Sequence, residues 1–317
     1  MTTSRGSAAL RLGLISLDFP SWQECVDEAA DRELDAVEIY VSPGFGLKDA
    51  KALKKRCDER GVTLAVISCL AKLSQAEDDV GDHLALITSA MRAAESIDVR
   101  NVGFMYGGCA RLGRHAARER FLARVTPLVE AARRSGVRLL IENVFSRHPS
   151  GDLDSVDHVL ELFNRLDPSS VALNFDPGNF AVAGEEAYPY AFEVLRPYIG
   201  GIHLKDVARY RYERHQDGES ARPLQDYARG LFLTEPLGEG SLNCSGLVRA
   251  LLGWDDCPPV MLEPFCADER RRAWLDRSLS FVREVTAQEI AARHAGGIRR
   301  QFSAAEAVPD IQEAAGK

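Results

Sequence analysis

Short apolar segments alternate with longer amphipathic segments along almost the whole chain. The apolar segments are four to six residues long and rich in Val, Ile and Leu, as expected of parallel strands that are buried on both faces. The predicted strands are Leu12–Leu17, Ala36–Tyr40, Leu64–Ser68, Asn101–Met105, Arg138–Glu142, Val171–Asp176, Ile199–Leu204 and Val260–Glu263. Parallel strands require crossover connections, and the amphipathic segments between them supply these connections.

The connecting segments have helical periodicity and recognisable ends. The predicted helices are Trp22–Arg32, Leu47–Arg60, Val80–Ile97, His115–Ser135, Ser155–Leu166, Glu185–Tyr198, Ser245–Leu252 and Ala267–Ala291. Gly61 and Gly136 directly follow two of them, where glycine commonly ends a helix. Pro189 and Pro197 make Glu185–Tyr198 the weakest of these predictions.

Eight strand-then-helix repeats favour a closed (β/α)₈ TIM barrel over an open doubly wound sheet. The first strand also runs into Asp18–Ser21 without the glycine-rich phosphate turn of a doubly wound dinucleotide-binding fold. We therefore expect a single catalytic domain at residues 11–288, after a flexible N-terminus at 1–10 and before a helical or disordered extension at 289–317. The polar segment Val207–Pro236, between the seventh and eighth strands, forms a long loop that is either a lid over the catalytic face or an exposed insertion.

Composition and charge narrow the class of protein. Hydrophobic residues make up 45% of the 317 residues and the net charge is −8, without a basic stripe, so nucleic acid is not an expected partner. No apolar run approaches the roughly 18 residues of a membrane span, so no membrane partner is expected either. The seven cysteines include no CxxC pair, which favours reduced thiols and a cytoplasmic location.

Four consecutive predicted strands end on a potential metal ligand. These residues are Glu142, Asp176, His203 and Glu263, and in a barrel the C-terminal strand ends meet at one rim. Buried carboxylates in such proximity repel one another unless a cation neutralises them. Three carboxylates and one imidazole suit a divalent ion with open octahedral positions, and we expect Mn²⁺, with Mg²⁺, Co²⁺ or Zn²⁺ as alternatives.

The sequence around these residues resembles a known superfamily. The motifs IEN (141–143), FDPGN (175–179), HLKD (203–206) and LEP (262–264), with the LGEG turn from Leu237, are similar to those of the xylose-isomerase-like barrels, which include sugar and sugar-phosphate isomerases and epimerases. The resemblance implies that Glu142, Asp176, His203 and Glu263 bind one metal and that Glu142 and Glu263 also transfer protons. Members of this superfamily often form dimers or tetramers, so a homo-oligomer is a further expectation.

Five other residues are candidates for substrate binding. Asn179 stands where ketose 3-epimerases of the superfamily usually have His, and Arg209 matches an Arg that phosphate-sugar epimerases often place six residues after the metal-binding His. Lys205 follows His203 by two residues, so the two side chains lie on the same face of the strand. Glu38 lies near the end of the second strand, and His148 lies in the loop after the fifth.

These residues predict a metal-dependent isomerase or epimerase of a sugar, sugar phosphate or cyclitol. A metal bound to a carbonyl oxygen and the neighbouring hydroxyl would hold the charge of an enediolate while Glu142 and Glu263 transfer protons on opposite sides. If a β-hydroxyl leaves instead, the same site is a lyase: a keto-inositol or dehydroshikimate dehydratase, or a C-glycoside-cleaving enzyme. A barrel that binds a sugar without turnover is the non-enzymatic alternative.

Overall fold

Eight parallel strands close into a barrel, as the alternation in the sequence predicts. The computed structural model describes residues 9–74, 80–108, 111–147, 152–211, 223–266 and 268–305. The barrel order is β1-β11-β7-β6-β5-β4-β3-β2. The strands are β1 (Leu12–Ile15), β2 (Ala36–Val41), β3 (Thr63–Lys72), β4 (Asn101–Met105), β5 (Arg138–Glu142), β6 (Val171–Phe175), β7 (Ile199–Leu204) and β11 (Val260–Leu262). The predicted fold class, a single TIM-barrel domain, is confirmed.

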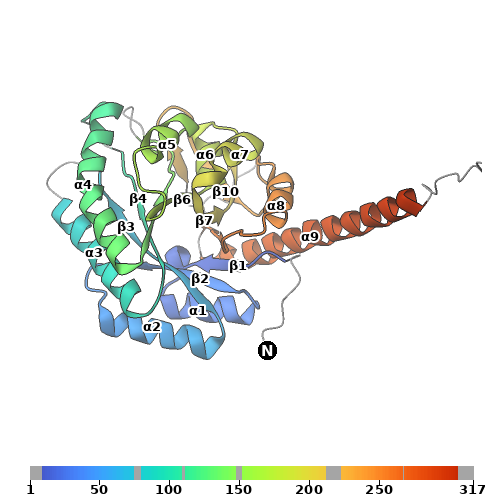
Figure 1. Cartoon of the computed structure of the whole chain (residues 1–317), viewed down its shortest axis with the longest axis horizontal. Coiled ribbons are helices and arrows are strands. Elements are labelled where there is room, and N and C mark those ends of the chain that lie inside the picture. The colour runs from blue at the N-terminus through green and yellow to red at the C-terminus, as the bar shows by residue number, and fades with distance from the viewer. Residues whose placement is uncertain are drawn as a thin grey trace, which may run out of the picture.

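Helices cover the outside of the barrel (Figure 1). They are α1 (Trp22–Asp31), α2 (Leu47–Arg60), α3 (Val80–Ser96), α4 (Arg114–Ser135), α5 (Val156–Phe163), α6 (Pro177–Ala183), α7 (Phe192–Leu195), α8 (Cys244–Leu252) and α9 (Asp268–Ala305). Gly61 and Gly136 end α2 and α4 in the left-handed conformation, as predicted. Among the described residues, no helix combines the length and apolar character that crossing a membrane requires.

The strand residues alternate between two buried environments. Leu14, Val37, Ile67, Leu139 and Leu173 point outward and belong to the large core shared with the helices. Residues in the other phase point into the barrel, where small clusters such as Ile15–Ala36–Met261 and Val66–Leu140–Ala172 fill the interior. Because side chains alternate with a period of two, the inward residues of each strand lead up to the C-terminal rim.

The connection between β7 and β11 contains regular structure that the sequence did not reveal. β8 (Asp206–Arg209), β9 (Leu224–Asp226) and β10 (Gly230–Glu235) form an antiparallel sheet in the order β8-β10-β9. Val207 and Leu224 of this sheet pack with Phe145 and Val182, which lie after β5 and in α6. The predicted insertion is therefore a small sheet, of which residues 212–222 lie outside the described residues, and it packs over the C-terminal end of the barrel strands.

Other differences from the predicted elements are local. The predicted helix Glu185–Tyr198 is broken into three short pieces, Ala187–Ala191, α7 and Arg196–Tyr198, and a helix that was not predicted, α6, directly follows β6. Helix α9 continues to Ala305, past the predicted end at Ala291, and its last turns extend away from the barrel (Figure 1). Residues 1–8 and 306–317 of the predicted terminal segments lie outside the described residues.

Candidate metal centre

Glu142, Asp176, His203 and Glu263 meet at the C-terminal rim of the barrel. One potential ligand atom from each lies within 4.8 Å of the others, and all four side chains are buried. The strand register explains this convergence, since Met261 pairs with His203 and Glu263 follows Met261 by two residues on the same inward face. Asp176 lies one residue beyond β6 and caps α6, so it serves both the helix and the cluster.

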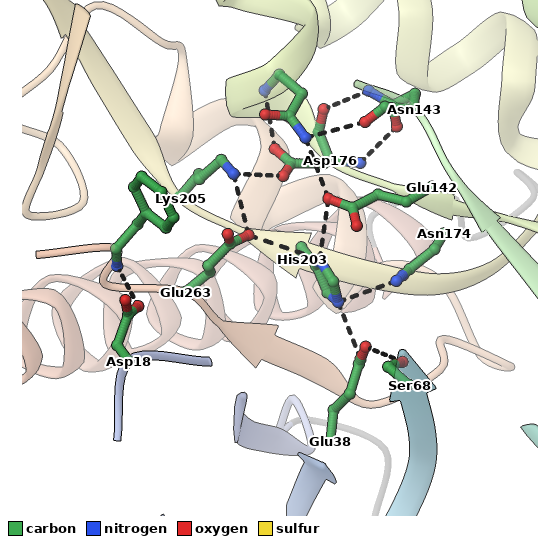
Figure 2. Close-up of polar contacts among 12 residues, drawn as sticks. Asp18, Glu38, Ser68, Glu142, Asn143, Asn174, Asp176, His203, Lys205 and Glu263 are labelled. Atoms are coloured by element: carbon green, nitrogen blue, oxygen red, sulfur yellow. Dashed lines mark hydrogen bonds and ion pairs between the residues drawn. The ribbon is translucent and has the colours of Figure 1, made fainter. Parts of the chain in front are cut away.

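His203 presents one ring nitrogen to the cluster and the other to the barrel interior. Nδ1 lies 3.5 Å from oxygens of both Glu142 and Glu263, whereas Nε2 lies 2.9 Å from Glu38 Oε2. Ser68 donates a 2.5 Å hydrogen bond to the other oxygen of Glu38 (Figure 2). Asn174 also contacts Nε2, at 2.9 Å. Glu38 is thus placed beneath His203, a buried position that we did not predict for this candidate substrate-binding residue.

Two asparagines hold the carboxylate side of the cluster. The side chain of Asn143 exchanges two 2.8 Å hydrogen bonds with the backbone of Asp176, which ties the end of β5 to the end of β6. Asn179 donates from Nδ2 to Glu142 Oε1 at 3.1 Å, and its backbone N–H donates to Asp176 Oδ1 at 2.9 Å. These contacts restrict the rotamers of both acids, as the ligands of a preformed metal site require.

The ammonium group of Lys205 lies between two of the acids. Nζ is 2.8 Å from Asp176 Oδ2 and 3.0 Å from Glu263 Oε2, and the side chain is buried. Gly178 makes room for the stem of Lys205, since a Cβ at Gly178 would lie 2.5 Å from Lys205 Cγ. Lys205 therefore contacts the centre directly, and it also lines the adjacent cavity.

The pKa values reflect a dense group of buried charges. Burial raises the pKa of Asp176 to about 7, against the lowering effect of Lys205. Burial also raises the pKa of Glu263, but Lys205 and His203 outweigh it and lower the net value. For His203, burial lowers the pKa, whereas the charges of Glu38 and Glu142 raise it well above the usual range. Protons and cations thus compete for the same acids.

The residues fit a divalent ion. Mg²⁺ binds oxygen at about 2.0–2.1 Å, so opposite ligands lie just over 4 Å apart, which is compatible with the 4.8 Å limit within the cluster. Nδ1 of His203 is buried and has no hydrogen-bond partner among the described residues, while the opposite nitrogen is held by a carboxylate, an arrangement typical of a metal-binding histidine. Three carboxylates and an imidazole favour Mg²⁺, Mn²⁺ or a similar ion.

A cavity of about 420 Å³ opens directly beside the cluster. Glu142, Asn179, Lys205 and Glu263 line its inner end. Apolar side chains form much of the remaining wall: Leu17, Leu70, Met105, Val144, Phe145, Leu224 and Phe265. Leu224 belongs to β9, so the inserted sheet contributes directly to the wall of the cavity. Lys72, Arg147 and Asp152 also line the cavity.

The remaining predicted site residues lie elsewhere. Arg209 is exposed at the end of β8 and is not among the residues that line the cavity. His148 falls outside the described residues. Asn143 and Asn174 were not predicted, although an asparagine in the apolar strand VALNF is a signal, because a buried amide requires a partner.

Comparison with known proteins agrees with this architecture. Residues 26–285 match the family model of the xylose isomerase-like TIM barrel, so the chain belongs to this family. No curated protein matches the sequence.

Similar solved structures share the fold at low sequence identity. A D-tagatose 3-epimerase-like protein is 19% identical, with 89% of this chain and 100% of the other covered and a TM-score of 0.67. A xylose isomerase-like TIM barrel protein from Mycobacterium smegmatis in complex with magnesium is 16% identical, with 89% and 98% covered and a TM-score of 0.63. The probable 3-DHS dehydratase involved in petrobactin synthesis from Bacillus anthracis is 15% identical, with 86% and 99% covered and a TM-score of 0.63. At these identities the likeness shows the fold alone.

Proposed function

We propose that the chain is a divalent-metal-dependent isomerase or epimerase of a sugar, sugar phosphate or cyclitol, which moves a proton at a carbon next to a carbonyl. The observation that carries the proposal is the pair Glu142 and Glu263. These carboxylates come from β5 and from the residue after β11, line the same cavity, and each lie 3.5 Å from His203 Nδ1. Two acids at one site suit the removal and return of a proton.

Each acid has a neighbour that suits its role. Lys205 beside Glu263 lowers the pKa of this carboxyl group and so keeps it ionised, the form that accepts a proton. Asn179 holds Oε1 of Glu142 and leaves the side chain oriented toward the cavity it lines. When bound by Glu142, Asp176, His203 and Glu263, the ion would polarise the substrate carbonyl. We propose Mn²⁺, with Mg²⁺, Co²⁺ or Zn²⁺ as alternatives.

Deuterium incorporation tests this proposal. The Mn²⁺-loaded protein is incubated in D₂O with ketoses, ketose phosphates and keto-inositols, and the products are examined by proton NMR after metal removal. We expect deuterium at a carbon next to the carbonyl with all hydroxyls retained. Substrates that convert without taking up deuterium would argue against a proton-transfer mechanism.

A variant of Glu142 assigns the proton transfer to this site. Glu142→Gln keeps the size and the hydrogen bond from Asn179 but cannot accept a proton, so we expect turnover to fall by about 10²–10⁴-fold with the fold retained. The surface variant Glu59→Gln serves as the control and should keep full activity. Full activity of Glu142→Gln, with an unchanged circular dichroism spectrum, would remove Glu142 from the mechanism.

A lyase is the second candidate function, and Lys205 favours it. Loss of a hydroxyl requires a third group that stabilises the leaving oxygen, and the Lys205 ammonium group, which lines the cavity 3.0 Å from Glu263, can donate a hydrogen bond to it. A probable dehydratase is among the similar structures. In the same NMR experiment, extended to dehydroshikimate, a new vinyl or aromatic signal would identify a lyase.

A further inference from the structure

Two cationic side chains that form no ion pair within the described part of the chain line the cavity. Lys72 ends β3 and Arg147 lies in the loop after β5, and both contribute to the cavity wall. Among the described residues, no carboxylate lies within ion-pair distance of either one. The guanidinium of Arg147 lies 5.8 Å from the centre of the Phe145 ring, in a cation–π contact. Neither residue belongs to the candidate metal centre.

The barrel register directs Lys72 to the mouth of the cavity. Ser68, Leu70 and Lys72 follow one another on the inward phase of β3, from Glu38 at the interior to the rim. Gly107 clears the space for the stem of Lys72: a Cβ at Gly107 would lie 2.4 Å from Lys72 Cβ. The lysine is therefore held by the fold and does not merely lie on the surface.

The nearby carboxylate, Asp152, is already engaged. Asp152 accepts hydrogen bonds from the backbone N–H of Gly108, at 2.7 Å, and of Leu153, at 2.8 Å. Burial raises the pKa of Asp152 to about 6, so part of its charge is lost in mildly acidic solution. Asp152 therefore balances Lys72 and Arg147 only in part.

The acids at the inner end of the cavity have partners of their own. Asp176 and Glu263 pair with Lys205, Glu142 accepts a hydrogen bond from Asn179, and Glu38 lies against His203. Lys72 and Arg147 thus leave one positive charge in excess over Asp152 at the mouth. Two cations facing one carboxylate at the mouth, beside apolar side chains such as Leu70 and Phe145, favour an anion there, even though the chain as a whole carries a net charge of −8.

We propose that Lys72 and Arg147 form an anion-binding subsite, so that the substrate of this barrel is a hydroxy-ketone bearing a phosphate or carboxylate group. The anionic end is bound at the β3–β5 side of the mouth, while the hydroxy-ketone end reaches Glu142 and Glu263. The inference rests on the proposed function for the orientation of the substrate, but the subsite itself rests on charge and position. It narrows the substrate class from neutral sugars and cyclitols to anionic compounds.

A matched set of three ligands tests the subsite by binding alone. D-Fructose, D-fructose 6-phosphate and D-fructuronate share the hydroxy-ketone end and differ at carbon 6, which carries a hydroxyl, a phosphate or a carboxylate. Their dissociation constants are measured by calorimetry with the Mg²⁺-loaded full-length protein. We expect at least one anionic ligand to bind tenfold or more tightly than fructose, and the stronger of the two identifies the anion.

Variants assign the preference to the two cations. Lys72→Met and Arg147→Gln should each weaken the preferred anionic ligand by roughly tenfold and leave fructose unchanged, since a charge-assisted hydrogen bond is lost. Arg147→Lys keeps the charge and should retain most of the preference. Lys51→Met, on the exposed face of α2, should change nothing.

The results separate this inference from the proposed function. Equal affinity for fructose and both anions, no measurable affinity for either anion, or an anionic preference that survives in the double variant would overturn the subsite. None of these results depends on turnover. Deuterium exchange with neutral sugars but not with anionic ones would support the isomerase and contradict the subsite. Tight anion binding without deuterium exchange would support the subsite and contradict the isomerase.

Discussion

The contact between Glu38 and His203 determines which ring nitrogen faces the candidate metal centre. A carboxylate that accepts a hydrogen bond from Nε2 keeps the proton there and leaves the lone pair of Nδ1 for a ligand. Ser68 in turn fixes Glu38. This chain of contacts runs from β3 through β2 to β7, across the inside of the barrel.

Replacing Glu38 should weaken metal binding. Glu38→Gln removes the charge beneath His203 but keeps the size of the side chain, so we expect the affinity for Mg²⁺ or Mn²⁺ to fall by about 10–100-fold. Isothermal titration calorimetry with the metal alone measures this. The exposed Glu33→Gln variant should bind as tightly as the wild type, and unchanged affinity in Glu38→Gln would show that the contact does not orient the ligand.

We expect the carboxyl group of Asp152 to make the free energy of unfolding depend on pH. Burial raises the pKa of Asp152 from its ordinary value of 3.8 to about 6, although Leu153, Gly108 and Lys72 oppose the shift. The folded state then binds more protons than the unfolded state between pH 4 and 6, so this carboxyl group destabilises the fold increasingly as the pH rises through that interval.

Urea unfolding of the wild type and Asp152→Asn isolates this effect. The difference in free energy of unfolding, wild type minus variant, should fall between pH 4 and 6 and remain constant above pH 7. Asp255→Asn, on the surface, should follow the wild type at a constant offset. A pH-independent difference for Asp152→Asn would mean that the folded-state pKa is not raised.

The sequence revealed some of these residues and not others, for a physical reason. Glu142, Asp176, His203 and Glu263 were predictable because a charged group that ends an apolar strand is costly without a partner. The contact of Glu38 with His203 depends on the stagger of β2 against β7, which no local pattern encodes. Lys72 and Arg147 resemble ordinary surface cations until the barrel places both at the cavity.

At the scale of elements, Asp206 organises the turn that leads to α8. Its carboxylate accepts hydrogen bonds from the backbone N–H groups of Val207, Gly238, Gly240 and Leu242, at 2.8–3.1 Å. Asp206, which ends the HLKD motif, therefore connects the start of β8 to the turn that follows β10. The GEG turn (238–240), which the sequence indicated only through its resemblance to the superfamily, folds around the carboxylate of Asp206.

Asp206→Asn should destabilise the protein by about 2–3 kcal/mol. The amide nitrogen cannot accept, so at least one buried backbone donor loses its partner. Chemical unfolding measures the loss, and Asp256→Asn, which is exposed, provides the matched comparison. If both variants unfold at the same denaturant concentration as the wild type, the turn does not depend on the carboxylate.

Elements with strong local signals were predicted well, and those held by tertiary contacts were not. The long helices end where glycine adopts the left-handed conformation, which the sequence indicates directly. β8, β9 and β10 are short, and β9 is the edge strand of a sheet that packs against α6 and the loop after β5. α6 was missed because it has only seven residues and contains Gly178, which is a weak local signal for a helix.

At the scale of the whole molecule, the metal should contribute to stability. The four ligands come from adjacent strands or their ends, β5, β6, β7 and β11, so an ion would tie one half of the barrel together. Saturation at about a hundred times Kd adds about 2.7 kcal/mol to the free energy of unfolding. We expect Tm to rise by several degrees in Mg²⁺ or Mn²⁺ relative to EDTA.

Asp176→Asn should abolish most of this gain, because the variant keeps the shape of the site but loses a ligand charge. Differential scanning calorimetry of both proteins, with and without metal, makes the comparison. Equal Tm values for the wild type in metal and in EDTA would contradict a site formed by these four residues.

The wall of the cavity comes from two parts of the fold, the barrel strands and the inserted sheet. The acids lie on barrel strands, whereas Leu224 lies on β9, in a stretch of chain that pairs only with β10 in the described structure and leaves the barrel hydrogen bonds intact. Changes in that stretch can alter the outline of the cavity without moving Glu142 or Glu263. On the proposed function, a library confined to β9 and β10 would therefore vary one wall of the cavity while Glu142, Glu263 and Lys72 keep their places on the barrel.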